Sequence, residues 1–350
     1  MKYYPHKKLK DICNKLLKSV GIENAIAIEV ADCLTQTSLR GVDSHGIRLL
    51  PHYIRVAKSG RINKDPNCSF NKTSPTTGIY DADHIYGHAA ASFAIKEAIK
   101  MADCSGSGFI VVKNSTHFSA SAYYALQASE QDMIGISCTN TSSMMVPTRG
   151  KRPFLGTNAI TFSFPCEGES PICLDMATTQ IAWNWVLKAR EEKKKLALAV
   201  GINKKGGTTD DPNETIGLLP AGMHKGYGLG LVVEILCGIL SNQTYGPHVS
   251  SMFDGDLSNK RYLSHFVGAI KISNFIDIKL FKALLKKMIT ELRNEPNIDT
   301  NMPIMVAGDP EKKSVIKRLK NGIPIESGTI NEINEIIDQQ GLEEKLKLLI

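Results

Sequence analysis

The sequence predicts a mixed α/β (α+β) fold in which a helical part, built from both chain ends, accompanies a central α/β part. Apolar residues recur at helical spacing near the start of the chain, over residues 7–20, and again near its end. Between these ends lie short apolar runs typical of buried strands, such as residues 108–112. We therefore place a helical domain at residues 1–75, completed by about residues 300–350, and a central α/β domain at residues 76–300.

Periodicity and helix-end signals define the elements of the first part. Leu9, Ile12 and Leu16 share one face of a helix, and Gly21 supplies its C-terminal stop. Gly60 ends a later helix in the same way. The helices predicted here cover residues 7–20, 24–39 and 50–58.

The middle of the chain alternates strands with helices, joined by polar loops. Thr178 and Thr179 carry hydroxyls that can cap a helix running to about Lys194. The predicted strands cover residues 108–112, 133–139, 155–164 and 171–174. The predicted helices cover residues 92–103, 123–130 and 178–194.

The last part returns to long helices after a turn at residues 208–213 and a glycine-rich loop at residues 219–226. One strand is predicted at residues 266–272. The helices predicted in this part cover residues 229–240, 275–293, 311–321 and 330–349.

Composition and charge exclude several classes of protein. The chain is 22% charged with a formal charge of +7, but its basic residues are interspersed with acids, which favours a solvated surface over a nucleic-acid-binding patch. The eight cysteines include no C-x-x-C pair, and most lie in apolar surroundings, which favours free thiols in a reducing compartment. We find no apolar leader and no membrane-spanning run. We expect a cytoplasmic protein that binds neither nucleic acid nor membrane.

Residues 40–51, reading R-G-V-D-S-H-G-I-R-L-L-P, hold a dense mixture of reactive side chains. His45 can exchange a proton near neutral pH, and Arg48 can hold a carboxylate by two parallel hydrogen bonds. Gly46 permits a sharp turn or a close approach to a ligand because it has no Cβ. The mixture indicates a site for a small acid, although a polar junction between helix and loop explains the same residues.

The run G-Y-G-L-G at residues 226–230 resembles a dinucleotide-binding fingerprint without matching it. The third glycine comes one residue early, and residues 219–225 before it form a loop instead of a hydrophobic strand. We therefore exclude an ordinary Rossmann domain. His224 and Lys225 at the start of a helix favour an anion such as phosphate, while glycines that allow close helix packing explain the loop equally well.

Two further polar residues follow predicted strands. His117 opens a helix after the strand at residues 108–112, a common position for functional residues. Asp175 follows an apolar run, where a carboxylate can orient a histidine, bind a cofactor or serve as an ordinary helix N-terminal acid. The scattered histidines form no metal-binding motif, so we predict no metal site, and G-x-S-x-G is absent. Acid/base chemistry is the class of reaction that remains.

Taken together, these motifs occur in an order that resembles a known family. They are D-S-H-G at 43–46, S-T-H-F at 115–118, G-T-N at 156–158, L-D-M-A-T at 174–178, T-D-P at 209–212 with one extra Asp, and L-L-P-A-G-M-H-K-G-Y-G-L at 218–229. In this combination the chain resembles the malate/L-lactate dehydrogenase family of nicotinamide-dependent oxidoreductases, which lack the Rossmann fold. The resemblance extends from about residue 8 to Glu311.

The resemblance implies a fold, a reaction and an assembly. It implies a mixed-sheet cofactor domain with a helical domain, a homodimer, and hydride transfer between NAD or NADP and C2 of a small 2-oxo or 2-hydroxy acid. We favour malate and oxaloacetate as the substrate pair. The alternatives are sulfolactate, lactate, ureidoglycolate, diketogulonate or a cyclic imine acid, or a silent member that only binds a nucleotide.

The resemblance also implies roles for individual residues. His45 would exchange the proton at the substrate oxygen, Asp175 would be its electrostatic partner or a cofactor ligand, and His117 would line the pocket. Ser44 and Arg48 would contact the substrate. Cofactor contacts are implied for Thr157, Asn158, Cys173, Leu174, Asp175, Met176, Ala177, Thr178, Thr179, His224, Lys225, Gly308, Asp309 and Pro310.

One position departs from the family pattern. The family's arginine position after S-H-G is Leu49 in this chain, and the neighbouring arginine is Arg48. Arg48 can still bind the substrate carboxylate after a small shift, or Arg40, Arg55 or Arg149 can bind it instead.

Overall fold

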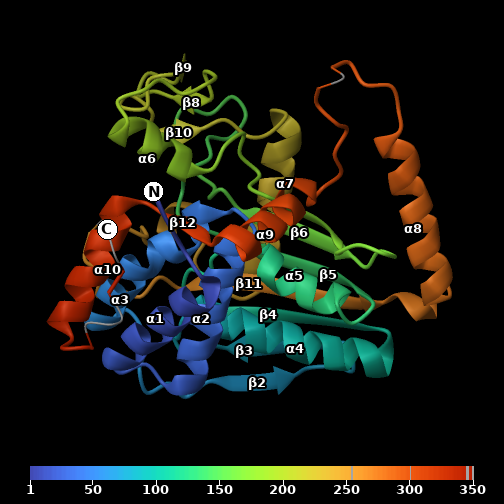
Figure 1. Ribbon diagram of the computed structural model, residues 1–350, viewed down its shortest axis with the longest axis horizontal. Coiled ribbons are helices and arrows are strands. Elements are labelled where there is room, and N and C mark those ends of the chain that lie inside the picture. Colours follow the sequence, from blue (N-terminus) through green and yellow to red (C-terminus); the bar gives the residue numbers. More distant parts are fainter. Residues whose placement is uncertain (254, 300, 344–346, 349–350) are drawn as a thin grey trace.

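The computed structural model describes residues 1–253, 255–299, 301–343 and 347–348, and its centre is a seven-stranded mixed sheet (Figure 1). The strand order is β2-β3-β4-β11-β5-β6-β7. The strands are β2 (Ser69–Lys72), β3 (Thr77–Asp81), β4 (Ser107–Ser115), β5 (Met133–Thr139), β6 (Ala159–Phe164), β7 (Ile172–Met176) and β11 (Leu263–Lys271). In this sheet β3 and β4 run parallel, and the other neighbouring strands run antiparallel. The predicted mixed α/β class is confirmed.

Glycines in two strands allow helices to lie very close to the sheet. A Cβ at Gly108 in β4 would come within 2.1 Å of the carbonyl oxygen of Ala98 in α4 (Gly87–Ser105). A Cβ at Gly135 in β5 would come within 1.9 Å of the carbonyl oxygen of Ala125 in α5 (Ala122–Ser129). Glycine is therefore required at both positions, and the two helices are fixed against the sheet.

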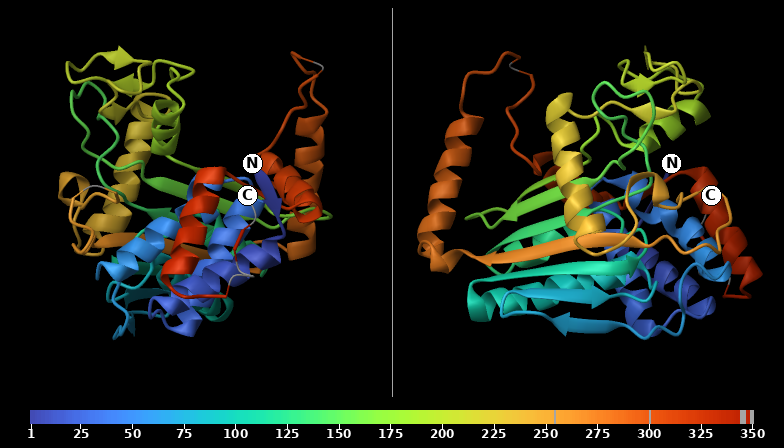
Figure 2. Two further views of the ribbon diagram at one scale, coloured as in Figure 1. Left: turned by 60° about the vertical axis from the view of Figure 1, so that its left-hand side comes forward. Right: turned by 180° about the vertical axis from the view of Figure 1, so that it is seen from behind.

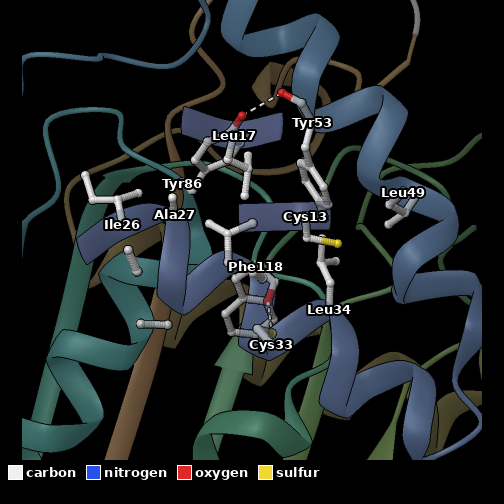
Figure 3. Close-up of a cluster of buried hydrophobic side chains, with 14 of the residues drawn as sticks. Cys13, Leu17, Ile26, Ala27, Cys33, Leu34, Leu49, Tyr53, Tyr86 and Phe118 are labelled. Atoms are coloured by element: carbon white, nitrogen blue, oxygen red, sulfur yellow. Dashed lines mark hydrogen bonds between the residues drawn. The ribbon is translucent and has the colours of Figure 1, made fainter. Parts of the chain in front are cut away.

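Helices from both chain ends form a layer beside the sheet. They are α1 (His6–Ser19), α2 (Asn24–Leu39), α3 (Leu50–Lys58) and α10 (Ser327–Gln339), and the ends are joined where β1 (Lys2–Tyr4) pairs with β12 (Ile323–Ile325). One continuous core extends from these helices to the sheet layer, with Leu17, Cys33, Tyr86 and Phe118 among its members (Figure 3). Residues from both sides of position 75 belong to this one core, so the domain boundary predicted there stays a proposal.

The other elements lie around the sheet. A small sheet of β8 (Gly201–Ile202), β9 (Thr208–Thr209) and β10 (Gly217–Leu218) lies near α6 (Trp183–Glu191). Helix α7 (His224–Glu234) continues as a π-helical turn, Ile235–Ile239. Helix α8 (Ile278–Arg293) stands at the side of the molecule, away from the body, and a long connection returns to α9 (Asp309–Asn321) (Figures 1 and 2).

The structure differs from the predicted elements at several places, and the short strands β1, β8, β9, β10 and β12 are among the elements that were not predicted. The helix predicted from Thr178 begins only at Trp183, because Thr178 donates from its backbone amide and its hydroxyl to the carbonyl of Thr157 (2.8 and 3.0 Å). The helix predicted at 330–349 ends at Gln339, followed by Gly341 at φ +61°, and positions 344–346 and 349 lie outside the described residues. Strands β2 and β3 were not predicted, because their short, polar sequences lack a long apolar run. Within the described ranges, no helix is both long and apolar enough to cross a membrane.

Candidate active site

The D-S-H-G stretch is held by contacts from two separate helices. It forms the short 3₁₀ turn Asp43–His45 directly after α2. Gly46 lies so close to α2 that a Cβ would come within 2.0 Å of Ser38 Oγ. Arg318 of α9 donates from Nη2 to Asp43 Oδ2 at 2.8 Å. The fold therefore fixes the position of His45 from both sides.

His45 lines a cavity of about 950 Å³, called the main cavity below. Its Nδ1 lies 2.8 Å from Ser44 Oγ, and the hydroxyl also lines the cavity. Nε2 has no protein hydrogen-bond partner in the part of the chain that the structure describes. Burial lowers the pKa of His45 to about 4, so the imidazole is neutral at pH 7 and one ring nitrogen is free for a ligand.

His117 lies beside His45 in the main cavity. The two ring centroids are 5.7 Å apart, and both residues line the cavity. The hydroxyl of Tyr53 lies 2.7 Å from His117 Nδ1, and Tyr86 donates to the backbone carbonyl of Tyr53 at 2.6 Å. Burial, then the neighbouring His45, hold the pKa of His117 well below its usual value. Two neutral imidazoles thus border one space.

Asp175 in β7 also lines the main cavity but does not pair with His45. Its Oδ1 accepts from Thr161 Oγ1 and its Oδ2 from the backbone amide of Ala122, both at 2.9 Å. Among the described residues it makes no hydrogen bond with His45. Although the residue opens onto the cavity, desolvation by the surrounding protein raises the pKa of its carboxyl. A direct hydrogen-bonded pair with His45 is therefore not formed in this structure.

Arg48 does not reach the main cavity. It donates from Nη2 to both carboxylate oxygens of Glu191 at 3.3 Å and lines an adjoining cavity of about 320 Å³, which shares Ser44 and Asn184 with the main cavity. Leu49, at the family's arginine position, lines the main cavity instead. In this structure the guanidinium of Arg48 pairs with the exposed Glu191, and the prediction that Arg48 binds the substrate stays a prediction.

The other arginines that the sequence offered for the substrate carboxylate differ in whether they line the main cavity. Arg55 pairs with Glu332 at 2.9 Å on the surface, and Arg149 is exposed in a loop. Arg40 lines the main cavity, as does Arg261, which the sequence did not single out. The sequence did not single out Arg261, because nothing in the neighbouring residues distinguishes it from other basic residues.

The opposite wall of the main cavity holds most of the predicted cofactor residues. It consists of β7, an edge strand of the sheet, and the start of α9. Cys173 N donates to the carbonyl of Ala307 at 3.3 Å, which ties these two segments together. The predicted residues on this wall are Thr157, Cys173, Leu174, Asp175, Met176, Ala177, Gly308 and Pro310.

Other predicted cofactor residues support the wall without lining the cavity. Asn158 Nδ2 donates to Glu234 Oε2 at 2.7 Å, so its amide holds α7. Arg293 Nη2 donates to Asp309 Oδ1 at 2.6 Å, which ties α8 to α9. Thr178 and Thr179 are likewise buried beside the wall. The side chains of these four residues thus have structural partners or positions, and a direct cofactor contact by them stays a prediction.

His224 and Lys225 lie at the exposed start of α7, outside the residues that line the main cavity. Their helix begins next to the wall, because Ala221 N donates to the carbonyl of Thr178 at 2.9 Å. Their predicted contact with a cofactor stays a prediction.

The main cavity is large for a ligand pocket. Its volume of about 950 Å³ lies near the upper end of the usual range of ligand pockets, roughly 300–1,000 Å³. Gly308 has φ +93°, and a Cβ there would lie 3.3 Å from Cys173 N and O, so a side chain at this point would crowd the wall. Outward-facing backbone groups of an edge strand are free to bond a ligand.

Comparison with known proteins identifies relatives of the whole chain. Residues 4–334 match the profile of the family described as malate/L-lactate dehydrogenase. The chain is 35% identical over 349 residues to a malate dehydrogenase of Pyrococcus abyssi, covering 97% of this chain and 95% of that protein. It is 32% identical to a malate/(S)-sulfolactate dehydrogenase of Methanothermus fervidus, with coverage of 94% and 95%. The solved structure of malate dehydrogenase from Entamoeba histolytica superposes with a TM-score of 0.92 at 31% identity, covering 98% of this chain and 99% of that one. With its fold and the order of its motifs both matched, this chain belongs to the malate/L-lactate dehydrogenase family.

Proposed function

We propose that this protein is an oxidoreductase that transfers a hydride between NAD(P)H and C2 of a small 2-oxo or 2-hydroxy acid. The observation that carries the proposal is the pair His45 and His117, whose ring centroids lie 5.7 Å apart in one cavity large enough for a dinucleotide and a small acid. Membership of a family whose relatives are named malate and sulfolactate dehydrogenases supports it.

His45 is the group that exchanges a proton with the substrate oxygen. Reducing a ketone places negative charge on that oxygen, and His45, whose ring is neutral at pH 7, supplies the proton after it has taken one up from solvent. In the reverse direction, neutral His45 accepts the proton of the hydroxyl group. Ser44 Oγ, 2.8 Å from Nδ1, orients the ring so that Nε2 is left for the substrate.

His117 completes the polar end of the cavity. Its Nδ1 lies 2.7 Å from the hydroxyl of the buried Tyr53, which fixes the ring. With Nδ1 occupied, the opposite edge of the ring is left for the substrate. His117 thereby holds the substrate oxygen or carboxylate in place while His45 exchanges the proton.

The wall formed by β7 and the start of α9 suits the nicotinamide cofactor. Its residues fit because the strand edge offers backbone hydrogen-bonding groups, while Leu174, Met176 and Pro310 supply an apolar surface. Thr157 and Asp175 supply polar groups on the same wall. When bound, the reduced nicotinamide supplies the hydride for C2. The choice between NAD and NADP is left to the assay below.

Malate and oxaloacetate are the substrate pair that we favour. Two relatives are named for malate, and one of them also for sulfolactate, and both acids carry a second anionic group besides the 2-hydroxy acid. Arg40 and Arg261 both line the main cavity and can oppose two negative charges. Lactate, ureidoglycolate, diketogulonate and cyclic imine acids are the other candidates.

We also propose a homodimer. Along α8, Leu280, Leu284, Met288 and Leu292 recur every four residues and are each about half exposed. An apolar stripe of this kind on a soluble protein marks an interaction surface. A second copy is the occupant that the family suggests, and size-exclusion chromatography with light scattering would measure it.

The experiment that tests the activity is the initial rate of NADH and NADPH oxidation against a panel of acids. The panel holds oxaloacetate, pyruvate, sulfopyruvate, 2,3-diketogulonate and a cyclic imine acid. We expect rapid turnover of one 2-oxo acid, which identifies substrate and cofactor together. Nucleotide binding without turnover of any acid would contradict the proposal and favour a silent binder.

A further inference from the structure

Arg261 is a buried arginine whose guanidinium has no carboxylate counter-ion among the residues that the structure describes. The residue is 2% exposed, lies on the segment that leads into β11, and lines the main cavity. Its Nε donates to the carbonyl of Ser250 at 3.1 Å, which sets the direction of the guanidinium. Nη2 is buried and has no hydrogen-bond partner within the described ranges. An uncompensated buried charge is strongly unfavourable, so this group requires a functional explanation.

A second buried arginine nearby shows the contrast. Arg61 donates from Nε to Asn259, from Nη1 to Met252 and from Nη2 to Asp256, all to backbone carbonyls at 2.9–3.2 Å. These bonds secure the backbone at Met252, Asp256 and Asn259, and Met252 lines the main cavity. Arg61 therefore has a structural role, whereas Nη2 of Arg261 bonds no other group in the described chain.

The surroundings of Arg261 favour an anion. No carboxylate of the described residues lies within ion-pair distance of it. The histidines of the cavity are neutral, because burial lowers the pKa of His45 to about 4 and that of His117 well below its usual value. Burial also lowers the pKa of Arg261 to about 9, which leaves it charged at pH 7. Arg261 and His117 line the same cavity, and the charge of Arg261 further lowers the pKa of His117.

We propose that Arg261 binds the carboxylate of the acid substrate, in place of an arginine after S-H-G. This inference rests on the proposed function and specifies how its site recognises an acid. A guanidinium held by Nε still offers Nη1 and Nη2 to a carboxylate. Leu49 stands at the family's arginine position, and Arg48 is directed to Glu191 outside the main cavity. The substrate's negative charge then compensates the buried guanidinium.

The test measures binding of oxamate, a carboxylate analogue of a small 2-oxo acid, to the full chain by calorimetry with and without NADH. Trp183 and Trp185 line the main cavity, so tryptophan fluorescence without NADH gives an independent reading. We expect Arg261→Gln to raise the Kd of oxamate by about 10–100-fold, as for the loss of a charged hydrogen-bonded partner. Arg55→Gln is the matched control, because Arg55 pairs with Glu332 on the surface, and the expected change in the Kd of oxamate is below about twofold. Equal Kd values for Arg261→Gln and the unmodified protein would overturn the assignment.

Arg261→Lys provides a second test if Arg261→Gln does not fold, because lysine keeps a positive charge at this buried position. Lysine cannot hold a carboxylate by two parallel bonds, so oxamate should still bind at least about fivefold more weakly than to the unmodified protein. The preference for oxamate over its neutral diamide, oxamide, should also fall in this variant. An unchanged preference and Kd would contradict the proposal.

Binding and turnover together separate this inference from the proposed function. Oxamate binding that depends on Arg261, without reduction of any acid in the panel, would support the carboxylate site and reject the dehydrogenase. Turnover with an unaltered KM in Arg261→Gln would reject Arg261 and keep the dehydrogenase. Failure of the unmodified, NADH-loaded protein to bind oxamate or any acid of the panel would overturn the carboxylate site itself.

Discussion

The two walls of the main cavity are built from different parts of the chain. On one wall, side chains carry the chemistry, and each is positioned by a neighbour, as Ser44 positions His45 and Tyr53 positions His117. On the other wall, the backbone of β7 and the start of α9 provide the surface. The first wall should therefore be sensitive to the loss of single polar atoms, and the second to added bulk. Substitutions on the two walls should also separate catalysis from nucleotide binding.

The largest effect is expected on the side-chain wall. His45→Gln should lower kcat by about a thousandfold, because general acid–base catalysis by one residue contributes roughly 10²–10⁴-fold. The Kd of the nucleotide, measured by calorimetry, should stay within about twofold, since glutamine preserves the volume and can still bond Ser44. Arg55→Gln, at the exposed pair with Glu332, should retain the kcat of the unmodified protein. A kcat of His45→Gln within tenfold of that of the unmodified protein would contradict the role of His45 in proton exchange.

A bulky substitution on the backbone wall should produce the reverse pattern. Gly308→Val places a side chain at φ +93°, with its Cβ 3.3 Å from Cys173 N and O. The crowding and the left-handed backbone, which costs about 1–2 kcal/mol, should push α9 away from β7 and raise the nucleotide Kd about tenfold. The Kd of oxamate without NADH should change little.

Gly60 supplies the matched control for that substitution. It has φ +90°, and no atom lies within 4 Å of where its Cβ would be. Gly60→Val should therefore lower the thermal stability by a similar amount without changing the nucleotide Kd. Equal nucleotide binding by both valine variants would show that the start of α9 does not form a cofactor wall.

A smaller effect is expected where a positioning bond is removed. Tyr53→Phe deletes the hydroxyl that lies 2.7 Å from His117 Nδ1, while the bond from Tyr86 reaches the backbone of Tyr53 and is kept. Losing a net hydrogen bond of about 1 kcal/mol should lower kcat about fivefold and leave the nucleotide Kd unchanged. A structural role alone would lower the melting temperature without this change in kcat, so both are measured.

Sequence reasoning predicted most of the fold, because long apolar periodicities report burial directly. The helix at 24–39 and the strand at 133–139 have the predicted bounds in the structure. Strand β3 was missed because its pairing depends on β4, more than twenty-five residues away in the chain, and β2 was missed because it pairs only with β3. The late start of α6 likewise depends on Thr157, which holds Thr178 against the sheet.

For the site, the motifs led to the residues that line the main cavity, including His45, His117 and Asp175. Arg261 was missed because its significance lies in what it lacks, a counter-ion, and only the packed structure reveals that. The direction of the Arg48 side chain could not be predicted, because it is decided by Glu191, which is remote in the sequence. Local chemistry can be predicted from neighbouring residues, whereas partners across the fold cannot.

The buried histidines should make the folded protein less stable in acid, and this is the smallest of the expected effects. Burial holds the pKa of His45 at about 4 and those of His52, His88 and His265 at about 3, and keeps that of His117 well below its usual value. Below pH about 6.5 the unfolded chain binds protons that the folded chain does not, so stability should fall as the pH falls.

His88→Leu tests how much one buried histidine contributes to the pH dependence of stability. His88 is fully buried against Tyr53, 4.7 Å between ring centroids, and neither of its ring nitrogens has a hydrogen-bond partner in the described chain. Leucine fills a similar volume without leaving buried polar atoms unpaired, so the variant should fold. The free energy of unfolding, measured by urea denaturation between pH 7 and 5, should fall less steeply with decreasing pH, by the contribution of about one proton. An unchanged slope would mean that His88 binds its proton inside the folded protein, and that the side-chain wall is more open to water than its burial indicates.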